Sequence, residues 1–146
     1  MVICDFVNIY FAFFSKIPTF DELALKINRN EVLSMSKKEY AVIGHPIGHT
    51  MSPFIHNRLF ELSGVDAQYS VIDVESEQLA KEYREKLSKL DGFNITIPHK
   101  SAIIPLLSSL DKKAELYGSV NTVDANGKGY TTDPDGFLQA LKSNGI

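Results

Sequence analysis

The stretch YAVIGHPIGHTMSP, residues 40–53, decides the fold. Its first five residues form a short apolar run that ends in glycine, which is typical of a buried strand in a parallel sheet. A polar loop follows, and then comes Ser52-Pro53. Serine as the N-cap and proline at the first helical position are a strong signal for the start of a helix. We therefore predict a strand, a polar loop at its carboxyl end, and a helix that ends at Gly64.

Strands and helices alternate through the rest of the chain. The hydrophobic pattern predicts further strands at 68–74, 93–97, 120–124 and 130–132. It predicts helices from Ser76 to Gly92, over the short segment 101–104, from about Ser109 to Tyr117, and after Asp133. Asn126-Gly127 lies between the last two strands and is favoured in a two-residue hairpin turn. We expect a three-layer α/β/α domain with a mostly parallel sheet and a late antiparallel hairpin.

Length, charge and cysteine content exclude several classes of protein. The chain has 146 residues, of which 44% are hydrophobic, so it has the size and composition of one folded domain. A net charge of -3 provides no basic excess for binding nucleic acid or an anionic membrane. Cys4 is the only cysteine, which rules out an internal disulfide and fits a reducing cytoplasm. No apolar run approaches the ~20 residues that a membrane helix needs.

The N-terminal region differs in composition from the rest of the chain. Its aromatic-rich start, MVICDFVNIYFAFF, contains Asp5, lacks a basic region and offers no small-residue cleavage site, so it is a poor secretory signal. The regular alternation of strands and helices begins only after Met35, which is a candidate natural start. We interpret residues 1–36 as an extension of unknown role and residues 37–146 as the domain, and we predict that residues 1–34 are dispensable for the core.

Nearly all the unusual polar residues lie in four segments, at 44–53, 92–100, 118–122 and 129–133, and each segment follows or ends a predicted strand. In open α/β sheets, ligands bind outside the carboxyl ends of the strands. The segments supply hydroxyls, carboxamides, one ammonium and one carboxylate, namely Thr50, Ser52, Thr96, Asn94, Asn121, Lys100 and Asp133. Neutral groups of this kind position ligand hydroxyls, and a lysine–aspartate pair can move a proton. The sequence therefore predicts a site for a small, heavily hydroxylated ligand.

The same four segments resemble the motifs of the shikimate dehydrogenases. That family carries G-x-P-I-x-H-S-x-S-P-x-x-H-N, G-x-N-V-T-x-P-x-K, G-A-V-N-T and G-x-N-T-D-x-x-G-F, and this chain has GHPIGHTMSPFIHN, GFNITIPHK, GSVNT and GYTTDPDGF in the same order. The resemblance covers about residues 40 to 141. It implies reversible, NADPH-linked reduction of 3-dehydroshikimate to shikimate, a step towards chorismate and the aromatic amino acids.

The resemblance also implies a role for each candidate residue. Lys100 would be the general acid–base, with Asp133 beside it binding a neighbouring hydroxyl. The three hydroxyl residues, Thr50, Ser52 and Thr96, would bind the substrate carboxylate. The two carboxamides, Asn94 and Asn121, would hold ring hydroxyls. Taken alone, Lys100 would be a solvated surface lysine and Asp133 a helix N-cap, whereas an N-cap role for Ser52 agrees with carboxylate binding at a helix N-terminus.

Three positions depart from the family pattern. Thr50 replaces a serine, which keeps the hydroxyl and adds a methyl group; Thr131 replaces an asparagine; and Ser119 replaces an alanine. The first two leave the choice between shikimate and quinate open. No G-x-G-x-x-G follows a strand, so we expect NADP to be bound by a domain absent from this chain and the chain alone to be inactive.

Other functions remain as alternatives. The chain could be a stand-alone module that binds a hydroxylated carboxylate without catalysis, or it could resemble a methylenetetrahydrofolate dehydrogenase, although the Thr-x-Pro-x-Lys and Thr-Asp motifs favour shikimate chemistry. All four histidines lie in or near the motifs, at positions 45, 49, 56 and 99. Pro46 and Gly48 forbid the helix that would align His45 with His49, so we expect structural or substrate-adjacent roles rather than a metal site. The sequence does not indicate an oligomeric state and does not decide between NADP and NAD.

Overall fold

The computed structural model describes residues 37–145. They belong to two compact parts, Lys37–Thr131 and the residues from Thr132 onward, and each part is described here by itself. The predicted extension, residues 1–36, lies outside the described residues, so its predicted dispensability stays a prediction. No helix among the described residues is long and apolar enough to span a membrane.

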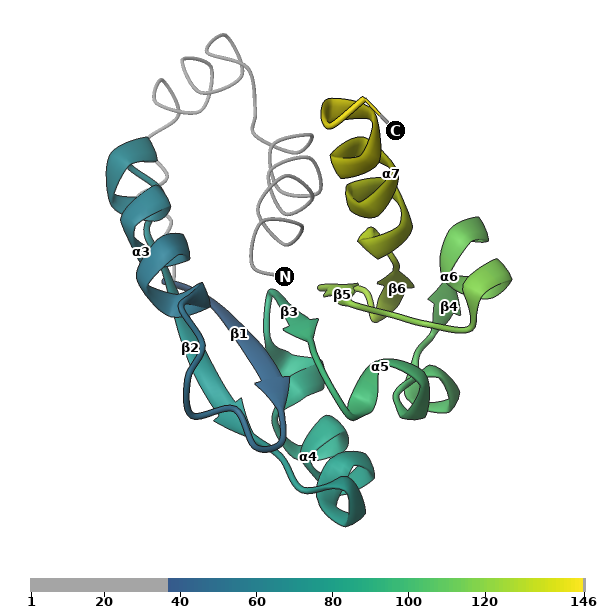
Figure 1. The fold of residues 1–146 in the computed structure, drawn as a ribbon. Coiled ribbons are helices and arrows are strands. Elements are labelled where there is room, and N and C mark those ends of the chain that lie inside the picture. The colour runs from purple at the N-terminus through teal and green to yellow at the C-terminus, as the bar shows by residue number, and fades with distance from the viewer. Residues whose placement is uncertain (1–36, 146) are drawn as a thin grey trace, which may run out of the picture. The chain divides into compact units, whose positions relative to one another are not determined.

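A six-stranded sheet forms the centre of residues 37–131, with the strand order β2-β1-β3-β5-β6-β4 (Figure 1). The strands are β1 (Lys38–Gly44), β2 (Ala67–Asp73), β3 (Gly92–Ile95), β4 (Ser109–Leu110), β5 (Thr122–Asp124) and β6 (Lys128–Tyr130). Within this sheet β5 runs antiparallel to both of its neighbours, and all the other pairs are parallel. The predicted fold, mostly parallel with a late antiparallel hairpin, is confirmed.

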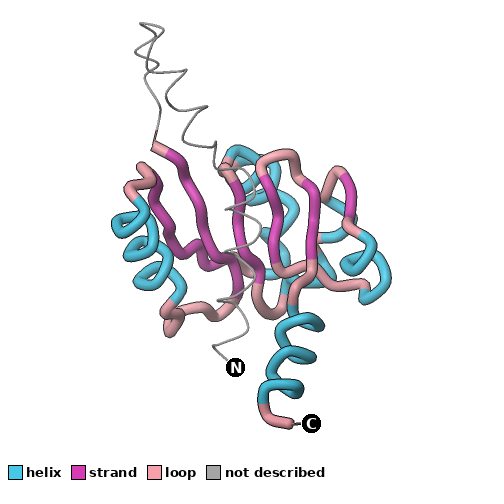
Figure 2. Tube along the Cα trace, turned by 90° about the horizontal axis from the view of Figure 1, so that it is seen from above, coloured by secondary structure: helices cyan, strands magenta, loops and turns pink. Residues whose placement is uncertain are grey.

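Helices cover both faces of this sheet, which gives the three predicted layers (Figure 2). Helix α3 (Ser52–Ser63) packs on the face that carries Tyr40, whose ring lies 5.6 Å from that of Phe60. The opposite face packs against α4 (Leu79–Glu85), α5 (His99–Ala102), α6 (Lys112–Tyr117) and three short 3-10 turns, η1 (Ser76–Gln78), η2 (Leu87–Lys89) and η3 (Ile104–Leu106).

The hydrophobic core lies between the sheet and α4, α5 and α6. Alternate residues of β1 and β3 point into it because side chains of a strand alternate between the two faces. The buried core residues are Ala41, Ile43, Val74, Leu79, Leu87, Phe93, Ile95, Ile103, Ala114, Val120 and Val123. At about 25 cal/mol per Å² of apolar surface buried, burying one side chain of this size favours folding by about 1.5–3 kcal/mol.

Two predicted helices differ in the structure. The helix predicted from Ser76 to Gly92 is divided into η1, α4 and η2, because Lys86 leaves helical geometry with φ -129° and ψ -56°. The helix predicted from Ser109 begins only at Lys112. Ser109 and Leu110 instead form the short strand β4, which pairs with β6, and the Asp111 carboxylate caps α6 by accepting a hydrogen bond from Ala114 N at 2.8 Å.

The β5–β6 hairpin has a three-residue connection, 125–127, rather than the predicted two-residue turn. Gly127 takes the left-handed conformation, with φ +73°, as the last residue of such a loop commonly does. The Asp124 carboxylate accepts hydrogen bonds from the backbone N–H groups of Asn126 and Lys128, at 2.8 and 3.0 Å. These bonds fix the turn that directly precedes β6.

The part from Thr132 onward contains helix α7 (Asp133–Ser143). Asp133 is the first residue of this helix and Thr132 its N-cap, without a side-chain capping bond. The alternative interpretation of Asp133 as the N-cap is therefore wrong. Lys100 belongs to the first part and Asp133 to the second. The prediction that these two residues line one cleft therefore stays a prediction.

Candidate active site

The carboxyl ends of β1, β3 and β6 lie at one edge of the sheet, and the antiparallel β5 begins at that same edge. The motif segments of residues 37–131 therefore meet there. Four backbone hydrogen bonds join them, with N–O distances of 2.8–2.9 Å, from Thr96 to Ile43, Ile95 to Asn121, Asn121 to Tyr130 and Val120 to Lys100. Six of the seven predicted site residues thus come from adjoining segments of this edge.

Thr50 and Ser52 form a hydroxyl pair at the start of α3. The Thr50 hydroxyl donates to Ser52 Oγ at 3.1 Å, and the Ser52 backbone N–H donates to Thr50 Oγ1 at 3.2 Å. Met51, not Ser52, is the N-cap of α3, and Pro53 is the second helical residue, so the predicted cap is off by one position. Helix boundaries commonly shift by one or two residues, and the Ser52 hydroxyl still lies in the first turn of α3.

Gly44 allows the segment after β3 to approach the end of β1. A Cβ atom at residue 44 would lie 2.5 Å from Thr96 Cγ2 and 3.0 Å from the carbonyl oxygen of Ile97. The backbone N–H of His45 donates to that same carbonyl at 3.1 Å. The glycine that ends the first apolar run is therefore what brings Thr96 next to the loop that carries the hydroxyl pair.

Lys100 lies on α5, and its helix is tied to the segment that precedes β5. The Lys100 carbonyl accepts from Val120 N at 2.8 Å, and the hydroxyl of Ser101 donates to the carbonyl of Gly118 at 3.0 Å. The Lys100 side chain is half-buried. A lysine held on a short, anchored helix at the carboxyl edge can serve as a positioned proton donor or acceptor.

Asn94 and Asn121 belong to one chain of hydrogen bonds. The Asn94 side-chain N–H groups donate to Thr122 Oγ1 at 3.1 Å and to the Asn121 carbonyl at 3.3 Å. The Thr122 hydroxyl donates to Asn121 Oδ1 at 3.1 Å. The Tyr69 hydroxyl completes the chain by donating to Asn94 Oδ1 at 2.6 Å. Both carboxamides are therefore oriented by neighbours within the domain.

Two residues of α3 support Tyr69: His56, for which we expected a structural or substrate-adjacent role, and Asn57, for which the sequence predicted no role in the site. The His56 ring stacks on the Tyr69 ring with a centroid distance of 4.3 Å, and Asn57 exchanges two hydrogen bonds, of 2.8 and 2.9 Å, with the Tyr69 backbone. Burial lowers the pKa of His56 to about 4, so this histidine is neutral at pH 7. The His-Asn pair that ends the first motif was the feature of the sequence that could have indicated this support.

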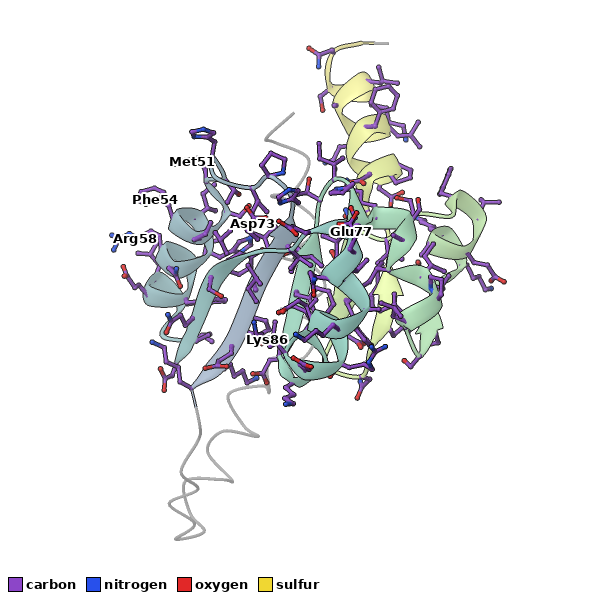
Figure 3. The ribbon with its side chains drawn as sticks, turned by 90° about the horizontal axis from the view of Figure 1, so that it is seen from below. Met51, Phe54, Arg58, Asp73, Glu77 and Lys86 are labelled. Carbon is purple, nitrogen blue, oxygen red and sulfur yellow. The ribbon has the colours of Figure 1, made fainter. Side chains whose placement is uncertain are left out.

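Two further histidines of the motifs, His45 and His99, make polar contacts at the ends of strands. His45 Nδ1 lies 2.6 Å from Asp73 Oδ1, which joins the loop after β1 to the end of β2; Asp73 is labelled in Figure 3. The fully buried His99 donates from Nε2 to the Val74 carbonyl at 2.6 Å. Within residues 37–145, no group of three or more His, Cys, Asp or Glu side chains is arranged to hold a metal ion.

Thr131 follows β6 and is almost fully buried. It is 3% exposed, and its hydroxyl oxygen has no hydrogen-bond partner in the described structure. A buried hydroxyl without a hydrogen-bond partner is unfavourable, and Thr131 is also one of the positions that depart from the family pattern.

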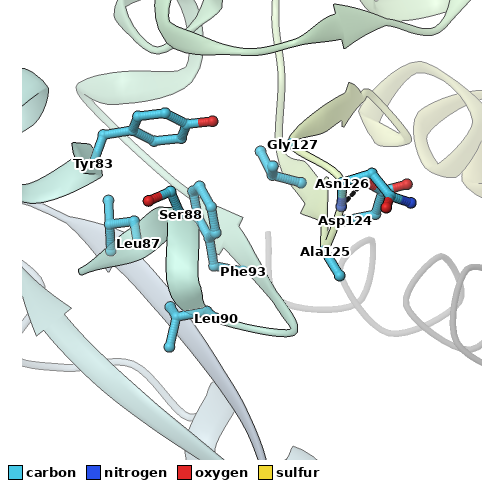
Figure 4. A pocket seen from close by; sticks show the side chains of 10 residues that line it. Tyr83, Leu87, Ser88, Leu90, Phe93, Asp124, Ala125, Asn126 and Gly127 are labelled. Atoms are coloured by element: carbon cyan, nitrogen blue, oxygen red, sulfur yellow. Dashed lines mark hydrogen bonds between the residues drawn. The ribbon is translucent and has the colours of Figure 1, made fainter. Parts of the chain in front are cut away.

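A cavity of about 200 Å³ lies at the opposite edge of the sheet (Figure 4). It is lined by α4, η2, the start of β3, the end of β5 and the β5–β6 turn, and the lining residues include Tyr83, Phe93 and Gly127. None of the seven predicted site residues lines it. We assign the site to the carboxyl edge because the candidate polar groups gather there.

Comparison with known proteins identifies the relatives of this chain. Residues 42–123 match the family model described as the shikimate dehydrogenase substrate binding domain. The NADP(+) shikimate dehydrogenase of Shouchella clausii is 42% identical over 108 residues, which cover 71% of this chain and 39% of that protein. The crystal structure of the Aquifex aeolicus shikimate dehydrogenase is 39% identical with a TM-score of 0.70, over 76% of this chain and 43% of that one.

A third relative was solved with ligands. It is the shikimate 5-dehydrogenase of Thermus thermophilus in complex with NADP(H) and shikimate, 37% identical with a TM-score of 0.68, over 75% of this chain and 43% of that one. The chain spans about two fifths of the length of the curated relatives it matches. The family model covers more than half of the chain, and the chain therefore belongs to the shikimate dehydrogenase substrate-binding domain family.

Proposed function

We propose that this chain is the substrate-binding and acid–base half of an NADP-dependent shikimate dehydrogenase, which interconverts 3-dehydroshikimate and shikimate. One observation carries the proposal: Thr50, Ser52, Asn94, Thr96, Lys100 and Asn121 all come from segments that meet at the carboxyl edge of one sheet. The relatives named as shikimate dehydrogenases provide the substrate class.

The hydroxyl pair would bind the substrate carboxylate. Because the Thr50 hydrogen is directed to Ser52 Oγ, the Ser52 hydroxyl can give its own hydrogen to an anion. The first turn of α3 adds a favourable field, since helix N-termini attract negative charge. Thr96, brought close by Gly44, would provide a third hydroxyl. Asn94 and Asn121 would contact the ring hydroxyls.

Lys100 would exchange the proton at the reacting oxygen of the ligand, giving it to the oxygen when the ketone becomes an alcohol and taking it back in reverse. Its short helix is fixed to the segment before β5, and such fixation is what an acid–base group needs. Asp133 is assigned beside it by its sequence motif alone, as the carboxylate that binds a neighbouring hydroxyl.

The β1–α3 connection does not fit the pyrophosphate of NADP. A pyrophosphate is usually held by a glycine-rich turn between a strand and the N-terminus of a helix. The β1–α3 connection instead carries Pro46, and Pro53 in the first turn of α3 offers no N–H group. The cofactor would be bound by residues outside 37–145.

Binding can be tested on the chain itself. Calorimetric titration with shikimate should give saturable one-to-one binding. Ser52→Ala should weaken that binding by about 10-fold or more, because a hydrogen bond to a charged group contributes about 1.5–3 kcal/mol. The exposed Ser88, at the opposite edge, provides the control variant Ser88→Ala, which should bind as wild type does. Absence of shikimate binding would contradict the proposal.

Catalysis can be tested after a nicotinamide-binding domain is fused behind Ile146. Lys100→Ala should lower kcat for NADP-linked shikimate oxidation by roughly 100- to 10,000-fold with a small change in KM. Asp133→Asn should also lower kcat. The exposed Lys89 gives a matched control, Lys89→Ala, with unchanged kinetics.

Two outcomes of the kinetic test would contradict parts of the proposal. If kcat survives Lys100→Ala, another group moves the proton and the acid–base assignment is wrong. If shikimate binds but the fusion has no turnover, the alternative of a binding module without catalysis is favoured.

A further inference from the structure

The hydrogen bonds around Asn94 determine which way its carboxamide points. One of its Nδ2 hydrogens faces the backbone carbonyl of Asn121, at 3.3 Å, and the other faces Thr122 Oγ1, at 3.1 Å. A carbonyl oxygen can only accept, so the NH₂ group, and not Oδ1, must face Asn121. Because Thr122 gives its own hydrogen to Asn121 Oδ1, it too accepts from Asn94. Both hydrogens of the Asn94 amide are therefore used.

The other end of the Asn94 amide faces Tyr69. Tyr69 lies on β2, and its hydroxyl reaches across β1 to donate to Asn94 Oδ1 on β3, at 2.6 Å. This short bond occupies one lone pair of Oδ1 and leaves the second as the remaining hydrogen-bonding capacity of the side chain. Asn94 is half-buried, so part of its side chain reaches the surface of the domain.

Tyr69 is itself held in place. It is 3% exposed, its ring stacks on His56, and its backbone N–H and C=O both bond to the Asn57 side chain. A tyrosine fixed at both its ring and its backbone cannot swing away to let the Asn94 amide rotate. The direction of the amide is therefore a property of the fold, set from β2 and β5 together.

We propose that Tyr69 is a positioning residue that, with Thr122, makes Asn94 a hydrogen-bond acceptor towards the ligand. This inference rests on the proposed function, because it requires Asn94 to face a ring substituent of the ligand. An acceptor at this position selects a ligand hydroxyl, which can donate, and disfavours a ketone, ether or fluorine, which cannot. The position thus recognises an alcohol at a ring carbon that does not react.

Fluorinated ligands test this selection on the intact chain. Shikimate and three analogues, each with one ring hydroxyl replaced by fluorine, are titrated by calorimetry. We call the Kd of an analogue divided by the Kd of shikimate its affinity ratio, or fluorine ratio. For wild type, one analogue should have a ratio of about 10, which corresponds to one lost hydrogen bond of about 1.4 kcal/mol. In Tyr69→Phe the ring that stacks on His56 remains and the two Nδ2 bonds stay, but the Oδ1 end of the amide loses the bond that positions it, so the affinity ratio for that analogue should fall clearly below 10.

Two further variants separate positioning from simple destabilisation. Thr122→Val removes the acceptor of one Nδ2 hydrogen, so the amide is held less firmly, and it should also reduce the ratio. Tyr83→Phe removes a tyrosine hydroxyl at the opposite edge and should leave the ratio at about 10. Adding Tyr69→Phe to Asn94→Ala should cause no further loss of shikimate affinity, because Tyr69 acts through Asn94.

The outcomes that overturn the inference are distinct. A fluorine ratio of about 10 in Tyr69→Phe, or losses that multiply in the double variant, would mean that Tyr69 does not act through Asn94. If wild type binds no shikimate, the proposed function and the ligand selection both fall. NMR of the Asn94 side-chain NH₂ group in the free protein then decides the orientation role, since Tyr69→Phe must shift these signals while Tyr83→Phe must not.

Discussion

The two faces of the sheet in residues 37–131 use neighbouring residues of the same strands for different purposes. On one face, Phe93 and Val123 are buried in the apolar core. On the other face, the adjacent Asn94 and Thr122 are joined by hydrogen bonds that continue to Tyr69. The strand pleat separates these neighbours by placing alternate side chains on opposite faces. Stability and ligand recognition can therefore be changed separately, and this separation can be tested.

The largest expected effect lies on the apolar face. Leu87 is 1% exposed and belongs to the core, so Leu87→Ala should lower the free energy of unfolding by about 2–5 kcal/mol through lost burial and a new cavity. Urea unfolding measures this loss. Leu116, 76% exposed, provides the control Leu116→Ala, with a change within about 0.5 kcal/mol. Shikimate affinity of the folded Leu87→Ala protein should be unchanged, and a parallel loss of affinity would show that the faces are coupled.

A smaller effect, dependent on pH, is expected on the polar face. Burial lowers the pKa of His56 to about 4 from a usual value of 6.5. The unfolded chain therefore binds a proton that the folded chain does not bind as pH falls from 6.5 towards 4. The contribution of His56 to stability is therefore largest above pH 6.5, and its loss by pH 4 should reduce the free energy of unfolding by about 3 kcal/mol.

The contribution of His56 can be isolated by comparing variants. His56→Phe keeps a ring against Tyr69 but cannot titrate, so its urea unfolding free energy should fall less between pH 7 and pH 4 than that of wild type. His49 is exposed, and His49→Gln should retain the wild-type pH dependence. Equal acid sensitivity in wild type and His56→Phe would mean that His56 is already protonated in the folded protein.

The sequence predicted the edge of the sheet better than it predicted the contacts behind that edge. Motif order and the strand–helix alternation were sufficient for the mostly parallel sheet and for the meeting of Ser52, Asn94 and Lys100 segments. The Tyr69–Asn94 bond was not predictable, because it crosses an intervening strand and joins residues 25 apart. Nothing in the local pattern around Tyr69 distinguishes it from an ordinary buried strand residue.

The missed helix break and short strand have similar causes. Leu79, Tyr83, Leu87 and Leu90 keep helical spacing through the break at Lys86, so periodicity alone predicts one continuous helix. The two residues of β4 form a strand only because β6 provides a partner. Both features depend on tertiary contacts, which local propensity does not contain.

The smallest expected effect on the free energy of unfolding comes from the His45–Asp73 pair, which lies at the carboxyl edge shared by both faces. The hydrogen bond to Asp73 raises the pKa of His45 above its usual value, with Glu75 and Glu77 adding to the effect, and the bond to His45 lowers the pKa of Asp73. Both members of the pair are ionised between about pH 4 and 6.5. The contribution of His45 to the stability of the folded protein is lost as pH rises through its raised pKa. The contribution of Asp73 is lost as pH falls through its lowered pKa.

NMR titration of the His45 ring measures this pair directly. The midpoint should lie above 6.5 in wild type and should fall in Asp73→Asn, because the acceptor of the ring hydrogen bond loses its charge. The exposed Asp66 precedes β2 at the opposite edge, so Asp66→Asn should leave the midpoint unchanged. Since both side chains are about half exposed, the free energy of unfolding should change little. A His45 midpoint that is the same with and without the Asp73 carboxylate would mean that the pair does not form in solution.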